Sequence, residues 1–358
     1  MITLCTLFDH NYLDKGLVLY KSLEANASNY KLYVLAMSDK CYDVLVDLDY
    51  PNLIPIKLSD FEKGNDALLE AKANRPFGRY CWTCGSSLIK YIFETFNPEN
   101  CTYIDSDMYF YEDPQILLDE MISKKASALV VGHRFSWYDK DHANITGQYC
   151  VEFNPFLNNK ESRELLNHWV EQCIECCEPL NDGIHYGDQM YINNWVSDYK
   201  FVVETEQLGA GVAPWNFDQY KMVSHDVTKD KYIVKCRGRE YPLIFMHFEN
   251  IVYLSEKQAD VGALTKWTSD RNFGTILYTD YLRRVNEIKK MLSTKYGIKV
   301  LIKKHIAFAD IRPDKDMSFI SRFKGMLKTL CTKDGLLFYF TEGIPYHIYR
   351  KYNIINID

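Results

Sequence analysis

The chain has no long hydrophobic run: no stretch of its 358 residues approaches the ~20 uninterrupted apolar residues that a membrane-spanning helix needs. It also lacks a basic amino-terminal segment, and the apolar run of residues 2–8 ends at Asp9, so we expect no signal peptide there. Eleven cysteines without such a signal are expected to be reduced thiols of a cytoplasmic protein. With 47% hydrophobic and 25% charged residues, the composition excludes an intrinsically disordered chain.

Positive charge is scarce in most of the chain and abundant near its end. The net charge is −6, but residues 271–358 carry 17 Lys and Arg against 8 Asp and Glu. Basic and apolar residues alternate over 283–304 and 318–340. Such helices can lie on an anionic membrane surface, or they can pack on the acidic body with Lys and Arg facing water, and we keep both alternatives. The strongly acidic body argues against a nucleic-acid partner.

The first half of the sequence alternates between strand and helix patterns. We expect strands at 2–8, 31–37, 53–58 and 101–105, with helices at 12–25, 40–48 and 83–96. This alternation predicts an α/β fold with a parallel, doubly wound sheet, whose ligands lie outside the carboxyl ends of the strands. The second half is mixed, and its expected elements are a strand at 148–157, helices at 160–177 and 187–195, strands near 200–204 and 242–248, and a largely helical segment from about 273.

Two aspartates stand at the end of one predicted strand. Asp105 and Asp107 interrupt the strongly apolar segment 101–111, where unpaired carboxylates would cost several kcal/mol to bury. A cation relieves that cost, and oxygen ligands of this kind suit Mg²⁺ or Mn²⁺ shared with substrate phosphates. The Asp-x-Asp pattern is common by chance, and the three other such pairs in the chain lie in polar or loop-like segments.

Four motifs occur in an order that resembles GT-A-fold glycosyltransferases of the glycogenin and lipopolysaccharide-galactosyltransferase type. They are Thr6–Tyr12 with Gly16, Tyr103–Met108, Gly187–Gln189 and Phe245–Phe248. The resemblance spans roughly residues 1–250. It implies a GT-A catalytic domain over 1–255, which is a Rossmann-like mixed sheet flanked by helices, and a mainly helical, basic extension over 256–358.

The resemblance also implies a reaction and a role for individual residues. The reaction is transfer of a hexose from a nucleoside diphosphate sugar, here a UDP-sugar, to a saccharide or lipid-linked acceptor, with retention of configuration. The implied roles are metal ligands (Asp105, Asp107, His247), contacts to the donor nucleotide (Asp9, Asn11, Tyr12, Lys90, Asp105) and contacts to the transferred sugar (Asp188, Gln189). Simpler alternatives are a hydrogen-bonded strand-end His247, Asp188 as the N-cap of a helix, and Tyr12 as a helix start.

The sequence departs from the family pattern at two places. Relatives read His-x-x-Gly-x-x-Lys, with the Gly amide and the Lys on the diphosphate, whereas residues 247–253 here read His-Phe-Glu-Asn-Ile-Val-Tyr. The diphosphate must then be held differently, or more weakly. Where relatives read Tyr-Asn-x-Gly, residues 149–152 end in Glu152, which we expect to face the donor sugar and take part in catalysis. The identity of the sugar and the stereochemical outcome stay open.

Two other functions are compatible with parts of this pattern. A sugar nucleotidyltransferase shares an α/β sheet and metal-binding carboxylates, but it needs a Gly-rich phosphate loop after the first strand, and residues 6–12 contain no glycine. A catalytically silent sugar-binding or scaffold protein is disfavoured by the intact Asp105/Asp107 and Asp188/Gln189 pairs.

Overall fold

A mixed β-sheet forms the centre of the structure, a computed structural model that describes residues 1–136, 140–180, 182–249, 251–261, 271–299, 302 and 354–357. Its strands, in spatial order, are β3 (Leu53–Lys57), β2 (Tyr30–Ala36), β1 (Ile2–Phe8), β4 (Asn100–Ile104), β8 (Phe153–Leu157), β6 (Ala128–Gly132) and β7 (Tyr149–Cys150), with β9 (Val202–Glu204) paired to β6. Strands β1–β4 are parallel and β8 is antiparallel to β4. The predicted Rossmann-like mixed sheet is confirmed.

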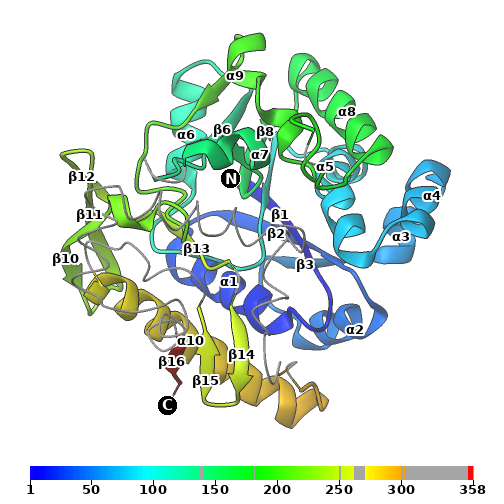
Figure 1. Ribbon diagram of the computed structural model, residues 1–358. Coiled ribbons are helices and arrows are strands. Elements are labelled where there is room, and N and C mark those ends of the chain that lie inside the picture. Colours follow the sequence, from blue (N-terminus) through cyan, green and yellow to red (C-terminus); the bar gives the residue numbers. More distant parts are fainter. Residues whose placement is uncertain are drawn as a thin grey trace, which may run out of the picture.

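Helices cover both faces of this sheet (Figure 1). One face packs against α1 (Leu13–Asn26), α2 (Asp39–Leu48) and α6 (Gln115–Ser123), and the other against α3 (Leu58–Glu62), α4 (Asp66–Asn74), α5 (Phe77–Phe96) and α8 (Lys160–Glu175). Because both faces are covered, β1 is buried at every residue, which explains its uninterrupted apolar sequence. The amide of Ser162 donates to Asn159 Oδ1, which caps the start of α8.

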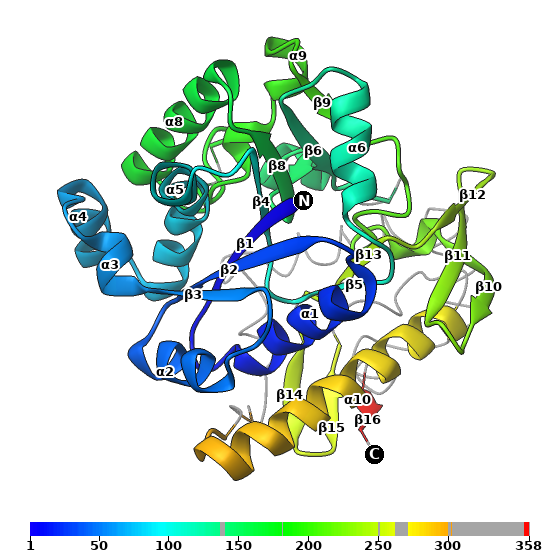
Figure 2. The same ribbon diagram turned by 180° about the vertical axis from the view of Figure 1, so that it is seen from behind.

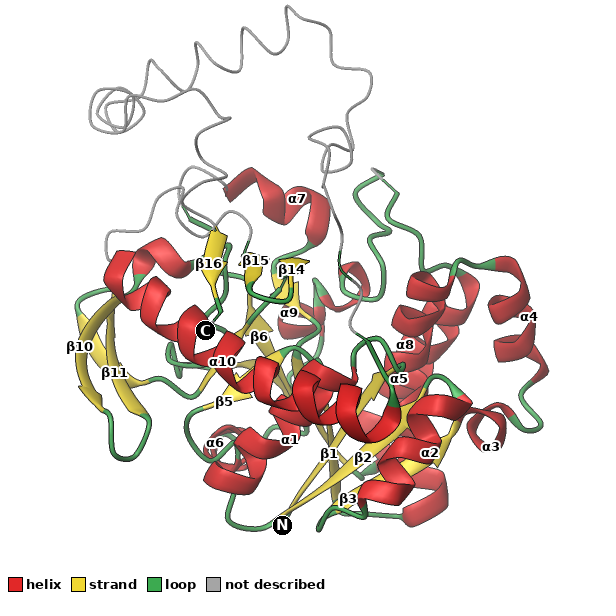
Figure 3. Cartoon of the chain, turned by 90° about the horizontal axis from the view of Figure 1, so that it is seen from below, coloured by secondary structure: helices red, strands yellow, loops and turns green. Residues whose placement is uncertain are grey.

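Three smaller sheets extend the central one on the side of α1. They comprise β5 (Met108–Phe110) with β13 (Phe245–His247), then β10 (Lys221–Asp226), β11 (Lys231–Cys236) and β12 (Arg239–Pro242), and finally β14 (Val252–Ser255), β15 (Gln258–Asp260) and β16 (Ile354–Asn356). Figure 3 shows β10 and β11 at one end of the molecule and α3 and α4 at the other. Among the described residues, the remaining α-helices are the short helices α7 (Ala143–Thr146) and α9 (Trp195–Asp198) and one long helix near the end of the chain.

The helix α10 (Arg271–Tyr296) lies alongside α1 (Figure 2). Its buried residues include Tyr281, Val285 and Leu292, so the apolar face over 271–299 packs on the body of the protein. This packing agrees with the second of the two alternatives for the basic tail, except that Lys289 is buried and does not face water. The other basic stretch, 318–340, lies outside the described residues. No helix among the described residues is long and apolar enough to cross a membrane.

Three expected elements differ from the structure. The helix predicted at 187–195 is wrong: that stretch contains a single 3-10 turn at Met190–Ile192, and α9 begins at Trp195. The strand predicted at 148–157 is interrupted at residues 151–152, between β7 and β8. The described part of the extension, predicted to be mainly helical, contains strands β15 and β16 beside α10, and β15 pairs with β14 across residue 255. The domain boundary at 255 stays a prediction.

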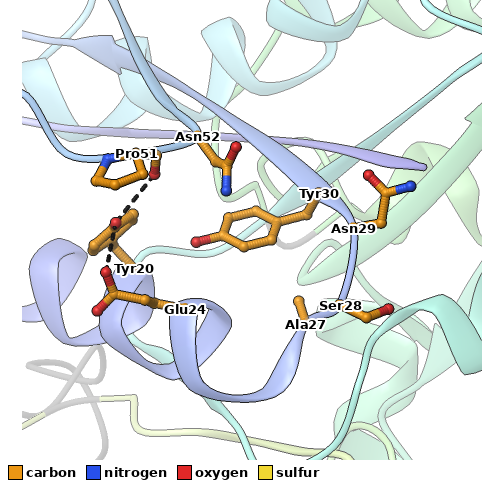
Figure 4. A pocket seen from close by; sticks show the side chains of 8 residues that line it. All are labelled: Tyr20, Glu24, Ala27, Ser28, Asn29, Tyr30, Pro51 and Asn52. Carbon is orange, nitrogen blue, oxygen red and sulfur yellow. Dashed lines mark hydrogen bonds between the residues drawn. The ribbon is translucent and has the colours of Figure 1, made fainter.

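A pocket of about 290 Å³ lies at the amino end of β2, away from the carboxyl ends of the strands (Figure 4). It is lined by Tyr20, Glu24, Ala27, Ser28, Asn29, Tyr30, Pro51 and Asn52. The Tyr20 hydroxyl, which is bonded to both Glu24 Oε1 and the Pro51 carbonyl, closes one side of it. The residues that the sequence motifs single out are not among its lining residues.

Gly16 sets the distance between α1 and β1, and we expect Gly16→Ala to destabilise the protein. A Cβ atom at this position would lie 2.4 Å from Cε1 of Phe8, a buried ring with little room to move. Overpacking of this kind costs about 1–3 kcal/mol. Chemical denaturation measures the loss. Gly78→Ala in α5, where a Cβ meets nothing within 4 Å, is the matched control and should leave stability unchanged or raised. Equal stability of the two variants would contradict the prediction.

Candidate active site

The chain brings Asp107 and His247 together through one strand pairing. After β4 the chain turns through residues 105–107 into β5, and β13 pairs antiparallel with β5 so that His247 lies opposite Met108. The amide of Phe248 donates to the Asp107 carbonyl at 2.9 Å, which fixes this register. Two segments 140 residues apart in sequence therefore meet at the carboxyl edge of the central sheet, the edge where ligands of α/β sheets bind.

The side chains of Asp105, Asp107 and His247 converge at this edge. His247 Nε2 lies 3.1 Å from Asp107 Oδ1 and 3.7 Å from Asp105 Oδ2. One potential ligand atom from each of the three residues lies within 4.8 Å of the others. The Tyr103 hydroxyl donates to Asp105 Oδ1 at 3.1 Å and restrains that carboxylate.

Glu152 lies behind His247, away from solvent. Its side chain has no exposed surface, and its Oε2 is 2.9 Å from His247 Nδ1. A carboxylate in this position favours a proton on Nδ1, so that Nε2 is the nitrogen that faces Asp105 and Asp107; it donates to Asp107 when it is protonated and is free to ligate a cation when it is not. We expected Glu152 to face the donor sugar; its observed contact is with His247 instead. The ring of Trp215 packs edge-on against the same imidazole at 5.4 Å.

The carboxylates of this cluster are crowded enough to shift one another's protonation. Burial raises the pKa of Asp105 to about 8 despite the attraction of His247, and the charges of Asp107, Asp188 and Glu152 add to the rise. Burial likewise raises the pKa of Asp188 to about 7. Two buried acids with raised pKa values, and no ion-pair partner other than His247 among the described residues, leave the site short of positive charge.

Asp107 and His247 behave as an ion pair within this cluster. Burial acts to raise the pKa of Asp107, but the charge and hydrogen bond of His247 and the charge of Lys15 outweigh it and hold that pKa below its ordinary value. Burial acts to lower the pKa of His247, but Asp107, Cys150 and Glu152 outweigh it and raise that pKa well above the ordinary range. In this structure the protonated imidazole supplies the positive charge next to the acids.

The donor set fits a divalent cation. Two carboxylates and one imidazole nitrogen converge, and the second nitrogen of the same ring is held by a buried carboxylate, an arrangement common around metal-ligating histidines. Carboxylate oxygens with one imidazole nitrogen are ligands that suit Mn²⁺ or Mg²⁺, whereas a set rich in thiolates would favour softer metals. The sulfur of Cys150 also lies near His247 and Glu152, but all three side chains are buried.

Asp188 lies close to this cluster, whereas the Gln189 amide is engaged elsewhere. Asp188 is buried, and its Oδ2 lies 3.6 Å from where a Cβ on Gly85 would stand, so the glycine of α5 makes room for the carboxylate. Gln189 Nε2 donates to the Thr146 carbonyl at 2.6 Å. The 3-10 turn that follows, Met190–Ile192, has Gln189 at its N-cap position, which removes the N-cap alternative for Asp188.

Asp9, Asn11 and Tyr12 form the loop between β1 and α1. Asp9 accepts hydrogen bonds from the backbone and side-chain nitrogens of Asn11, so the two residues brace each other. Tyr12 is 44% exposed, and burial together with the charges of nearby acids, Asp107 first among them, raises the pKa of its hydroxyl. The exposed ring therefore borders the acidic cluster.

A lysine that the sequence motifs do not single out acts by its charge on the Asp107 carboxylate, and the expected contact of Lys90 with the donor nucleotide stays a prediction. Lys90 is on α5, half-buried, and the lysine whose charge stabilises the Asp107 carboxylate is Lys15, in the first turn of α1. Lys15 lies inside the first motif, between Tyr12 and Gly16, which is the signal that could have identified it. Tyr103 could likewise have been found, because side chains two residues apart on a strand share a face with one another.

Comparison with known proteins gives relatives at low identity. No protein-family model matches the chain. Two uncharacterized proteins of Bacillus subtilis (strain 168) are similar to it: YfnD, 29% identical over 260 residues that cover 71% of this chain and 79% of YfnD, and YfnF, 27% identical over 263 residues that cover 70% of this chain and 83% of YfnF.

Two solved structures with a similar fold are those of enzymes. One is galactosyltransferase LgtC in complex with donor and acceptor sugar analogs (16% identity, TM-score 0.47, covering 70% of this chain and 87% of that one). The other is mouse xyloside xylosyltransferase 1 in its apo form (13% identity, TM-score 0.45, covering 69% of this chain and 97% of that one). Both of these proteins are glycosyltransferases.

We expect Asp105→Asn to stabilise the metal-free protein at pH 8. The folded state holds a proton on Asp105 up to about pH 8, whereas the unfolded chain releases it near its ordinary pKa of about 4. The Asp105 contribution to the free energy of unfolding therefore falls as the pH rises through that window, and the amide removes this loss. Denaturant unfolding in chelator should give a gain of at least ~1 kcal/mol at pH 8 that disappears near pH 4. Glu70→Gln, on the exposed surface of α4, is the control and should show no such pH-dependent gain.

Glu152→Ala should weaken binding of Mn²⁺ alone by about 10–100-fold, because His247 loses the partner that orients its ring. Glu152→Gln, which keeps an oxygen near Nδ1 of His247, should lose less Mn²⁺ affinity than Glu152→Ala. Free Mn²⁺ measured by electron paramagnetic resonance during a titration gives both affinities. Glu62→Gln is the matched control, since Glu62 is a buried carboxylate bonded to Tyr80 and Lys72 in another part of the protein. Unchanged Mn²⁺ affinity in Glu152→Ala would show that Glu152 does not orient His247.

Proposed function

We propose that the protein is a metal-dependent glycosyltransferase that moves a hexose from a nucleoside diphosphate sugar, here a UDP-sugar, to a hydroxyl of a saccharide or lipid-linked acceptor. The observation that carries the proposal is the convergence of Asp105, Asp107 and His247 at the carboxyl edge of the sheet. The order of the four sequence motifs supports the proposal. A bound divalent cation would also balance the excess negative charge of the site.

Each part of the site has a role in this proposal. Asp105, Asp107 and His247 hold Mn²⁺ or Mg²⁺, with Tyr103 and Glu152 restraining two of these ligands from behind. The bound ion supplies positive charge that stabilises the departing nucleoside diphosphate. The loop of Asp9, Asn11 and Tyr12 borders the acids and offers an exposed aromatic ring on which a base can stack.

Asp188 is the acidic group that we assign to the transferred sugar. It is buried beside the cluster, and burial raises its pKa to about 7. Near neutral pH it can therefore donate a hydrogen bond to a sugar hydroxyl when protonated, or accept one from that hydroxyl when ionised. Gln189 is assigned to the same sugar by its motif. Retention of configuration rests on the family resemblance.

A thermal-shift screen identifies the nucleotide. A ligand that binds only the folded state raises the apparent melting temperature, so nucleoside diphosphates tested with and without Mn²⁺ reveal both the base and the metal dependence. A sugar nucleotidyltransferase would instead consume a nucleoside triphosphate and a sugar 1-phosphate and release pyrophosphate, which the same preparations can be tested for. A silent binding protein would bind nucleotide and metal without cleaving any donor sugar.

We expect Asp107→Asn to lower the turnover of nucleotide sugars by about 100-fold or more at saturating Mn²⁺, because one charged ligand is lost where charge develops in the transition state. Release of nucleoside diphosphate from a panel of nucleotide sugars measures turnover. Asp60→Asn, on the exposed surface of α3, is the control and should match the wild type. Near-normal turnover by a folded Asp107→Asn protein would overturn the metal assignment.

A further inference from the structure

Lys15 is a buried lysine held between two tyrosine rings. It belongs to the first turn of α1 and is only 5% exposed. Its ammonium lies 4.1 Å from the centre of the Tyr12 ring and 5.3 Å from that of the Tyr253 ring. The two rings come from the β1–α1 loop and from β14, and both restrict where the ammonium can go.

This ammonium has no carboxylate partner within the part of the chain that the structure describes. The neighbouring Asp14 is the obvious candidate, but its Oδ2 accepts the Tyr253 hydroxyl at 2.8 Å and its Oδ1 accepts the backbone amide of Lys15 itself at 2.9 Å. Lysines are almost never buried unless they are paired. Contacts with aromatic rings offset only part of the cost of burying a charge. Lys15 therefore lacks an anion.

A second lysine adds positive charge to the same place. Lys289 of α10 lies 4.0 Å from the centre of the Tyr253 ring, and its buried ammonium has no hydrogen-bond partner in the structure. Lys15 and Lys289 thus share one aromatic ring, with Asp14 as the carboxylate next to them. Within this patch, Asp14–Lys15–Tyr253–Lys289, two ammonium groups stand against one carboxylate, and the exposed Glu256 adds a further negative charge that acts on Lys289.

This patch adjoins the acidic cluster. The charge of Lys15 acts on Asp107, and the charge of Asp107 also acts on Tyr12, the exposed ring that Lys15 contacts. The site therefore has two oppositely charged regions. In one, the acids outnumber the cations beside them, and in the other, no carboxylate of the described residues pairs with the ammonium of Lys15. A nucleoside diphosphate bound through a divalent ion carries both charges in one ligand, with the ion at the acids and the phosphates beside them.

We propose that Lys15 binds the diphosphate of the donor nucleotide, and that this chain uses a lysine of α1 for the contact that residues 247–253 do not provide. The proposal rests on the proposed function, since it names the residue that holds the donor's phosphates. Tyr12 and Tyr253 keep the ammonium next to the acids. Lys289 holds its ammonium against Tyr253 with no hydrogen-bond partner among the described residues, and in this proposal it acts only by adding positive charge to the patch.

Lys15→Met tests the contact, because methionine keeps an unbranched apolar side chain between the two rings and removes only the charge. Binding of UDP, UMP and uridine is measured by calorimetry in chelator, so that no metal contributes. A charged hydrogen bond of about 1.5–3 kcal/mol predicts that Lys15→Met binds UDP ten- to a hundredfold more weakly than the wild type. Uridine should bind both proteins equally, and Lys15→Arg should keep part of the UDP affinity.

Three controls separate this contact from other effects. Mn²⁺ alone should bind Lys15→Met as tightly as the wild type or more tightly, which excludes a collapsed metal site. Lys21→Met, on the exposed side of α1 where Lys21 pairs with Glu24, should bind UDP normally. Lys289→Met should lose much less UDP affinity than Lys15→Met; an equal loss would mean that only the general field of the patch matters, and would overturn the proposal.

The outcomes also distinguish this inference from the proposed function. If the wild type binds UDP in chelator and Lys15→Met binds it equally well, Lys15 does not contact the diphosphate and the glycosyltransferase proposal is untouched. If the wild type prefers none of UDP, GDP, CDP and ADP over the corresponding nucleosides, with or without Mn²⁺, the proposed function fails and this inference fails with it.

Discussion

The pairing of β5 with β13 is the contact on which the candidate site depends. It places His247 opposite Met108 and therefore beside Asp107, and it joins a segment near residue 247 to the edge of a sheet built from the first 160 residues. Because side chains alternate between the two faces of a strand, a shift of one residue in this register would turn His247 away from both aspartates. The Phe248 amide and the Asp107 carbonyl hold the register at the point where it matters.

Charge imbalance is the second constraint, and it links the two halves of the site. Carboxylates gathered at one sheet edge cost stability, as the raised pKa values of Asp105 and Asp188 indicate, burial being the main cause. His247 offsets part of that cost by an ion pair with Asp107. Lys15, in the first turn of α1, is instead a buried positive charge that no carboxylate contacts among the described residues. Proteins retain such costs where a ligand of complementary charge removes them, and the two imbalances together match a metal-bound diphosphate.

The helix α10 is part of the body of the protein. It packs along α1, the helix that carries Lys15, and it contributes Lys289 and several buried tyrosines to the region behind the site. The predicted domain boundary at residue 255 lies at the end of β14, which pairs with β15. Tyr253 contacts Asp14, before that boundary, and Lys289, after it. The acidic body and the basic segment that follows it are thus complementary in charge over the described residues.

The sequence by itself determined the α/β class, the order of the first strands and helices, and the pairing of Asp105 with Asp107. These features are local: an apolar run, a helical period and two acids at a strand end can be read from neighbouring residues. The assignment of His247 as a third ligand came from the order of motifs, and the structure brings it within reach of both aspartates.

Only the tertiary structure decided what depends on distant contacts. Glu152 lies behind His247, the helix expected over 187–195 is reduced to a single 3-10 turn, and the charge of Lys15 acts on Asp107. None of these could be read from spacing, because each depends on which buried group a polar side chain meets across the fold. Lys15 and Lys90 are equally basic in the sequence, and the packing of α1 against β14 and α10 is what sets them apart.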